Sequence, residues 1–381
     1  MAVTAEHLIL LKSAAPIRAA PAANVALVRL YFALLSGLAV AAFVLGVENR
    51  FTASGLFVLP PPVDWLPPLS GPAWANAYAL HQQDPAFAAC GGTETLAQFR
   101  LIYWWEWLRR ASLLVLAAAA MPGLCAACAA PRWRFVLPRL LGPAALAVAW
   151  WPVRVLVGLA VDASPTMSSF NIGQYRHAVD VAFASAAIAG LLASALVPPS
   201  RTAAVRSRRK ARGEWVWIAL ITFDICLGAF LAACNAAAAW PTWPGYGSGH
   251  VLPPLAQLTS YAPWWLNLTF NPYGIQLAHR ALSSALWIAA AWQLGAALLG
   301  GRPAMRAGMR LGLISAQAAA GVATLLLGVP AGLSIAHQLG GIALLAMAVA
   351  FWLAGHETGR VPSIRLVASR QATAMRLARS A

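Results

Sequence analysis

Long apolar runs recur along the whole chain, with polar or proline-rich segments between them. A transmembrane helix needs about 20 mostly apolar residues. Eight runs reach that length, at 26–47, 99–121, 135–161, 174–197, 215–238, 273–299, 308–329 and 331–354. Only a tight turn at Pro330 separates the last two runs. The pattern predicts an all-α fold, a polytopic membrane helical bundle with eight transmembrane helices.

Composition excludes the main alternatives to a membrane protein. Hydrophobic residues make up 60% of the 381 residues and charged residues only 10%. A soluble domain has about 45–50% apolar and about 25% charged residues. The apolar residues also come in long runs, which excludes a disordered or fibrous chain. We therefore expect the lipid bilayer to be the surroundings of most of the chain.

The basic residues predict the orientation of these helices. The net charge is +16, and 18 Lys and Arg residues fall in the segments 1–25, 122–134, 198–214, 300–310 and 355–381. The opposite loops, 48–98, 162–173, 239–272 and the Pro330 turn, contain only Arg50. Because basic loops stay in the cytoplasm, both termini are predicted to be cytoplasmic, in a bacterial inner membrane. The first 25 residues lack the pattern of a signal peptide.

The basic segment 198–214 is interpreted as a cytoplasmic loop, not as a nucleic-acid site. Base-reading or stacking groups are needed beside the charge for nucleic-acid binding, and this segment has none. We therefore expect no nucleic-acid partner.

The eight runs divide into two sets of four with similar connecting loops. In each half the first run leads into a long loop rich in Trp and Pro, at 48–98 and 239–272. This similarity predicts two four-helix repeats. The tryptophans are expected either to anchor the chain at the membrane interface or to cover a site, and both can hold. The predicted domains are a tail, a first half, a basic linker, a second half and a basic tail, at 1–25, 26–197, 198–214, 215–354 and 355–381.

Two histidines of the second half are the strongest candidates for a cofactor site. His279 and His337 each lie about six residues inside the same end of their runs, which places both about 9 Å deep. Imidazoles at matched depth on alternate helices suit the two axial positions of a heme b. Zinc is disfavoured because no Cys or carboxylate lies near them in the sequence.

The equivalent positions of the first half carry charged residues instead. Arg109 corresponds to His279, and Asp180 has the depth of His337. Opposite charges in a low dielectric are tolerated when they pair, so a direct Arg109–Asp180 ion pair is expected. Glu106 is a rival partner for Arg109, because residues three apart meet on one helix face.

At these residues the sequence resembles the heme A synthase family of mitochondria and related bacteria. Residues 46–56, Gly-Val-Glu-Asn-Arg-Phe-Thr-Ala-Ser-Gly-Leu, are similar to the family's Gly-Gly-x-Thr-Arg-Leu-Thr-x-Ser-Gly-Leu. Residues 99–110 resemble its Phe-Lys-x-Ile-x-Trp-Trp-Glu-x-x-His-Arg, and residues 276–280 its Gln-Phe-x-His-Arg. Further matches follow at 242–244, 263–267, Gln317 and 329–338. No single motif is specific, but their order and spacing over residues 28–355 are.

The resemblance implies a different task for each half. His279 and His337 would hold a heme b that passes electrons, and the first half would bind heme O. A ring methyl of heme O is oxidised by successive hydroxylations to the formyl group of heme A, and Glu106 occupies the place of a catalytic glutamate. The chain departs from the family where Arg109 and Asp180 replace both substrate-site histidines. His177, three residues before Asp180, is a candidate for a shifted ligand.

Three functions remain open from the sequence. The first is an enzyme that converts heme O to heme A for cytochrome c oxidase biogenesis, with heme O synthase, oxidase assembly factors or a second copy of the chain as partners. The second is a non-catalytic heme b protein acting in oxidase assembly or electron transfer. The third, a transporter with a parallel repeat, has the least support. A disulfide between Cys90 and Cys234 is sterically allowed by the topology but not required.

Overall fold

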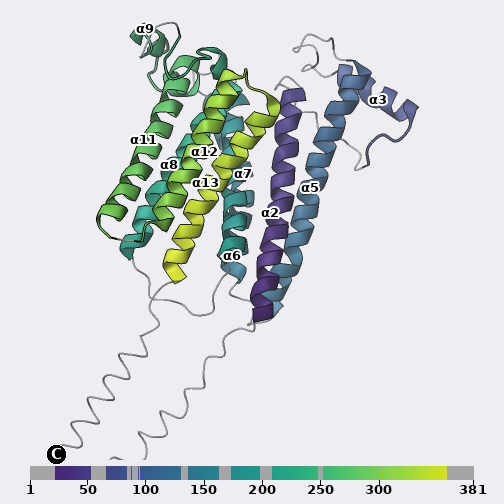
Figure 1. Ribbon diagram of the computed structural model, residues 1–381. Coiled ribbons are helices and arrows are strands. Elements are labelled where there is room, and N and C mark those ends of the chain that lie inside the picture. Colours follow the sequence, from purple (N-terminus) through teal and green to yellow (C-terminus); the bar gives the residue numbers. More distant parts are fainter. Residues whose placement is uncertain are drawn as a thin grey trace, which may run out of the picture.

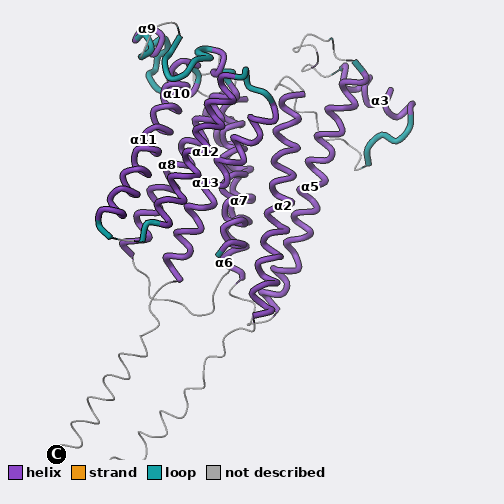
Figure 2. The backbone as a smooth tube through the Cα atoms, in the orientation of Figure 1, coloured by secondary structure: helices purple, strands orange, loops and turns teal. Residues whose placement is uncertain are grey.

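Long helices make up most of the computed structural model of the chain, and strands are absent from the part that the structure describes. Figure 2 shows the helices running roughly side by side, with short loops at their ends. The described residues are 22–52, 66–83, 87, 93, 95–129, 136–162, 173–197, 208–247, 252–301 and 303–357. The predicted segments 1–25, 198–214 and 355–381 fall largely outside them.

Eight of the described helices are long and apolar enough to cross a membrane, which confirms the predicted spans. A helix suits this environment because it satisfies every backbone polar group within one segment. The eight are α2 (Ala22–Thr52), α5 (Leu96–Ala129), α6 (Leu137–Asp162), α7 (Gly173–Leu196), α8 (Arg208–Ala233), α11 (Pro272–Leu299), α12 (Met305–Leu326) and α13 (Ala331–Glu357).

Helix α8 ends before its expected boundary. The apolar run continues to residue 238, but the helix ends at Ala233, and Asn235 adopts a left-handed conformation with φ 49°. Asn tolerates this conformation better than most residues. A short 3-10 helix, η2 (Ala236–Ala238), follows and turns the chain into the next loop. In contrast, prolines do not end helices α5 and α6. Helix α5 continues through Pro122, and α6 continues through Pro143 and Pro152.

Each half forms a ring of four helices with the same order of contacts. In the second half α8 packs on α11, α11 on α12, α12 on α13 and α13 on α8. In the first half α2 packs on α5, α5 on α6, α6 on α7 and α7 on α2. This shared order is what two four-helix repeats would produce, and the repeat itself stays a prediction.

The two halves meet mainly through α7 and α13. Helix α7 packs against α13 and α8, and α2 reaches α13 (Figure 1). Half of the most apolar part of α13 is buried, whereas only 6% of the corresponding part of α5 or α6 is. The outward residues of α5 and α6 are themselves large and apolar, among them Leu101, Leu113, Val148 and Leu156. Such surfaces suit contact with lipid and not with water.

Short helices interrupt the long loops, which the sequence pattern did not predict. Helix α3 (Gly71–Gln82) lies in the first long loop, and α9 (Leu255–Leu258) and α10 (Leu266–Thr269) lie in the second. Figure 1 shows α3 and α9 at the same end of the molecule, opposite the end where α2 begins and α13 finishes. Ser70 caps α3 by accepting a hydrogen bond from the Ala73 N–H.

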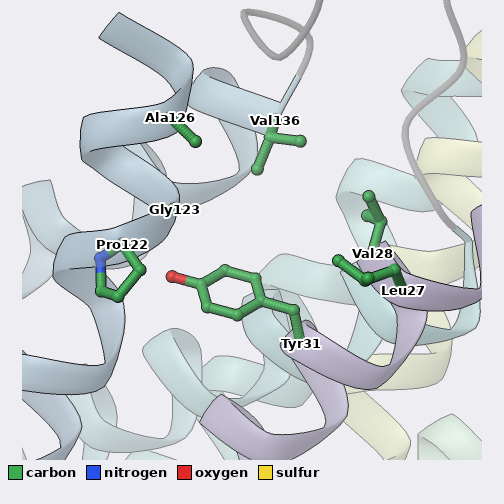
Figure 3. Close-up of a pocket in the computed structure, with 7 residues that line it drawn as sticks. All are labelled: Leu27, Val28, Tyr31, Pro122, Gly123, Ala126 and Val136. Carbon is green, nitrogen blue, oxygen red and sulfur yellow. The ribbon is translucent and has the colours of Figure 1, made fainter. Parts of the chain in front are cut away.

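An apolar pocket lies at the opposite end, between α2, α5 and the start of α6 (Figure 3). Tyr31 of α2 points across it, and its hydroxyl donates to the backbone oxygens of Ala119 and Ala120, at 3.2 and 2.9 Å. A Cβ atom at Gly123 would meet the hydroxyl and ring of Tyr31, so a side chain there would displace the Tyr31 ring from this position. The pocket is part of the α2–α5 packing and is remote from the histidines.

Candidate functional site

The structure brings His279 and His337 together across the second ring of helices. His279 comes from α11 and His337 from α13, which do not neighbour each other in the ring. Their ring centroids are 6.5 Å apart and the ring planes are nearly perpendicular, at 86°. The matched depth predicted from the sequence therefore corresponds to a direct meeting of the two side chains.

Each imidazole lies against a glycine of the helix beside it. A Cβ atom at Gly228 of α8 would be 3.6 Å from Cε1 of His279. A Cβ atom at Gly321 of α12 would be 2.8 Å from Cε1 of His337 and 3.3 Å from its Nε2. The His337 ring therefore occupies space that Gly321 leaves open, whereas a Cβ atom at Gly228 would make only an ordinary van der Waals contact with His279.

The residues present fit a heme held through its iron. Two trans imidazoles with metal–nitrogen bonds of about 2 Å have ring centroids roughly 6.4 Å apart, close to the observed 6.5 Å. The Nδ1 atom of His337 is buried and has no hydrogen-bond partner among the described residues. The described residues contain no group of three or more His, Cys, Asp or Glu side chains placed to hold a metal ion, so the pair suits heme iron better than a four-ligand metal site.

A carboxylate that the sequence analysis overlooked stands behind His279. Oδ1 of Asp224, on α8, lies 2.9 Å from Nδ1 of His279, a distance typical of an ion pair, although the N–H is not aligned on the oxygen. The hydroxyl of Ser283 donates to the other carboxylate oxygen at 2.9 Å. A carboxylate within an apolar span is costly, and this was the signal that could have identified Asp224.

Arg280 and Gln276 attach the second long loop to α11. Arg280 donates to the backbone oxygens of Trp240 and Thr242, at 3.1 and 2.8 Å, and its guanidinium lies 4.7 Å from the centre of the Tyr246 ring. Gln276 donates to the same Trp240 oxygen at 3.1 Å. Since Arg280 directly follows His279, the loop is fixed to the helical turn that carries the ligand.

Gln317 stabilises the backbone at His337. Its side-chain amide donates to the His337 carbonyl at 2.8 Å, from α12 to α13. Gly340, on α13, leaves room for this side chain, because a Cβ atom there would meet Gln317. Two of the family signatures, Gln317 and the segment 329–338 that contains His337, are therefore in direct contact.

In the first half, Glu106 holds two arginines of its own helix. Arg109 binds it with two hydrogen bonds, including one of 2.8 Å from Nε to Oε2, and Arg110 donates from Nε to Oε1 at 2.7 Å. The Arg109 side chain also lies against α2, where a Cβ atom at Gly46 would be 3.2 Å from Cδ. Arg109 thus packs on a glycine of α2 much as His279 packs on a glycine of α8.

The expected direct ion pair between Arg109 and Asp180 is wrong. Asp180 turns toward α6, where it accepts a hydrogen bond of 2.7 Å from Trp150 Nε1 and lies 3.3 Å from Nε of Arg154. Glu106 is the partner of Arg109 because it sits one turn away on the same helix and matches the guanidinium with two oxygens. The rival partner named from the sequence is therefore the one that forms.

The structure describes two of the three other candidates named from the sequence, His177 and Cys234, but not Cys90. His177, considered as a shifted ligand, lies on α7 with its Nδ1 atom buried. Cys234 is a free thiol that donates to Gln174 Oε1, so it does not form the disulfide that the topology allowed. Cys90, its proposed partner, lies outside the described residues.

Comparison with known proteins shows the family to which the chain belongs. The sequence model of the COX15-CtaA family, described as cytochrome oxidase assembly protein, matches residues 29–349. The chain is 32% identical over 333 residues to a heme A synthase of Rhodopseudomonas palustris, covering 84% of the chain and 89% of the relative. It is 30% identical over 344 residues to a heme A synthase of Bradyrhizobium, covering 86% and 91%. The chain therefore belongs to the family of cytochrome oxidase assembly proteins that includes the heme A synthases.

Proposed function

We propose that the chain is a heme A synthase-type membrane oxidoreductase. It would oxidise a ring methyl of heme O to the formyl group of heme A and supply heme A for cytochrome c oxidase. The observation that carries the proposal is the meeting of His279 and His337 at a separation suited to one iron atom. The curated relatives named heme A synthase cover nearly the full length of the chain and support the same activity.

In this proposal the second half binds a resident heme b. His279 and His337 would hold its iron from opposite sides, and the heme, when bound, would supply a path for electrons. Arg280 and Gln276 keep the loop containing Trp240 attached over this end of the ring.

The first half would receive heme O near Glu106. Glu106 is buried and accepts hydrogen bonds from Arg109 and Arg110. A carboxylate that accepts several charge-assisted hydrogen bonds is a weak proton acceptor. Glu106 would therefore act on a substrate only when binding opens at least one of these bonds. The substrate's own carboxylates are suited to attract the released guanidinium.

A second function is favoured by the same first-half geometry. Arg109 and Asp180 occupy the positions of the two substrate-site histidines, and both are already engaged with neighbouring side chains. A chain with only the second-half site would be a non-catalytic heme b protein acting in electron transfer or oxidase assembly. Heme O synthase, assembly factors and a second copy of the chain are proposed partners in either case.

Extracted hemes would separate the two functions. The full chain is produced in a membrane that supplies heme O, and its hemes are analysed by the pyridine hemochrome spectrum and by mass. Heme b with heme O, hydroxylated heme O and heme A supports the enzyme. Heme b alone, at one per chain, supports the non-catalytic protein.

The ligand assignment is tested in the same preparation. His279→Ala and His337→Ala should each abolish a six-coordinate low-spin b-type spectrum. Thr324→Ala is the control, because Thr324 only donates to a carbonyl of its own helix and its loss leaves the histidines untouched. A full wild-type spectrum in both histidine variants would refute the heme b site.

A further inference from the structure

We propose that Asp224 is a positioning residue that orients the His279 imidazole and strengthens it as an electron donor, so that the two ligand histidines are unequal. The inference rests on the proposed heme b site between His279 and His337. It assigns a role to an intramembrane carboxylate that the proposed reaction does not use. It also predicts a measurable electronic property of the bound heme.

One turn of α8 contacts the His279 ring at two points. Asp224 and Gly228 are four residues apart and therefore share a helix face. Asp224 Oδ1 lies 2.9 Å from Nδ1, and Gly228 leaves space beside Cε1. A carboxylate at Nδ1 selects the tautomer with its proton on that nitrogen and leaves Nε2 available for a metal.

Ser283 fixes the carboxylate from the same helix as the ligand. It follows His279 by four residues on α11 and donates to Asp224 Oδ2 at 2.9 Å. Both oxygens of Asp224 are thereby directed, one toward a hydroxyl and one toward the imidazole.

His337 has no equivalent support. Its Nδ1 atom is buried without a hydrogen-bond partner in the described part of the chain, and Gln317 binds its backbone carbonyl and not its ring. The two histidines, although matched in depth, therefore differ in what stands behind them. Only His279 has a negative charge directly behind its ring.

A purely structural role for Asp224 is the alternative. An Asp224–His279 pair connects α8 to α11, as any interhelical polar contact would. The two helices are already packed through Ile221, Leu286 and Ala290, which belong to one buried apolar cluster. A structural contact would change stability when removed, but it would not systematically change the electronic state of a heme.

The expected electronic effect has a definite sign. A hydrogen-bonded carboxylate raises the basicity of a ligating imidazole. A more basic and more negative ligand favours the oxidised, more positive iron, which lowers the reduction potential. Removing the charge of Asp224 should therefore raise the potential of the heme.

The experiment uses the purified full-length protein with its bound heme. Reduction potential, the low-spin electron paramagnetic resonance spectrum and heme content are compared for the wild type, Asp224→Asn, Ser283→Ala and Ser194→Ala. Ser194→Ala is the control, because Ser194 is buried on α7 and donates only to Gly190 of its own helix. Asn keeps the shape of Asp and removes its charge.

We expect Asp224→Asn to shift the potential upward and to change the resonance spectrum at unchanged heme content. Ser283→Ala should give a smaller shift of the same sign, and Ser194→Ala none. If Asp224→Asn does not fold or loses heme, Ser283→Ala carries the test through its smaller upward shift of the potential. Potentials and spectra equal to the wild type in the heme-containing variants would overturn the role of Asp224.

Failure of the proposed function looks different. A wild-type protein without heme, or a heme whose spectrum survives both His279→Ala and His337→Ala, would overturn the heme b site and the role of Asp224 together. If the heme depends on both histidines but its reduction potential is unchanged in Asp224→Asn, only the role of Asp224 is overturned.

Discussion

Gly321 determines where the His337 ring can lie. A Cβ atom there would approach the ring to 2.8 Å, so Gly321→Ala should displace the imidazole and reduce heme occupancy by half or more. Gly312, on the same helix, has nothing within 4 Å of a Cβ atom and is the matched control. Gly312→Ala should raise helix stability by about 0.5–1 kcal/mol. Equal heme content in the two variants, measured by absorbance per protein, would contradict the close approach.

Cys234 offers a residue-scale test that is independent of heme. Burial raises the pKa of its thiol to about 11. The thiolate is the reactive form, so the neutral thiol prevails below that pH. At pH 8 roughly a thousandth of the groups are thiolate, against roughly a quarter for an ordinary cysteine with a pKa of about 8.5.

Alkylation kinetics should therefore distinguish the native from the unfolded chain. In native protein the rate at Cys234, followed by mass spectrometry of its peptide, should rise about tenfold per pH unit from pH 8 to 10. In denaturant it should level off above about pH 9. Equal rates at pH 8 in the two states would show that the thiol is accessible and ordinary.

At the scale of helices, the first half depends on how Arg109 is paired. Its partner Glu106 is on the same helix, whereas Asp180 is bound to Trp150 and lies beside Arg154 on α6. Double-mutant cycles should give a coupling of about 1–3 kcal/mol for Arg109 with Glu106, and less than about 0.5 kcal/mol for Arg109 with Asp180. Leucine substitutions and unfolding in detergent supply the free energies of unfolding.

The Asp180–Arg154 cycle is the control for this measurement. It should give a coupling larger than that of Arg109 with Asp180, because those two side chains are in contact. A large Arg109–Asp180 coupling would restore the pair expected from the sequence and contradict the observed side-chain arrangement.

Depth along a helix could be read from the sequence, but direction around it could not. Counting residues from the helix ends placed His279 and His337 at one level, and they meet. Arg109 was matched to His279 by the arginine that follows each of them, and Asp180 to His337 by its depth, but Arg109 and Asp180 do not bond. A long arginine side chain folds back to a carboxylate one turn away, and Asp180 faces a neighbouring helix that the count did not include. Asp224 was overlooked because it carries no motif.

The helices, like the side chains, could be predicted only in part. Runs of more than 20 apolar residues located all eight long helices. Helix α3 was not predicted because its 12 residues are too short to appear as a run of about 20 apolar residues. Tertiary contacts, which the sequence pattern does not show, help to hold α3 in place. Trp74 of α3 packs edge-on against Tyr103 of α5, with 5.1 Å between the ring centroids.

At the scale of the whole molecule, the orientation in the membrane is the open prediction. Exposed Ser260 lies in the second long loop and exposed Gly300 in the connection between α11 and α12, which the sequence predicts on opposite sides of the membrane. In a chain with its native cysteines replaced by serine, Ser260→Cys should react with an impermeant maleimide in intact cells. Gly300→Cys should react only after permeabilisation, and the reverse pattern would invert the orientation.

The attachment of the loop to α11 constrains how the protein can be assembled. Arg280 and Gln276 make hydrogen bonds to three backbone carbonyls of residues 240–245, directly above the turn that carries His279. A porphyrin arriving from the loop end would have to break these bonds and displace the Tyr246 ring. Entry from the loop end therefore requires the loop to detach from α11 first, and the order of loading and loop closure becomes a property of these few hydrogen bonds.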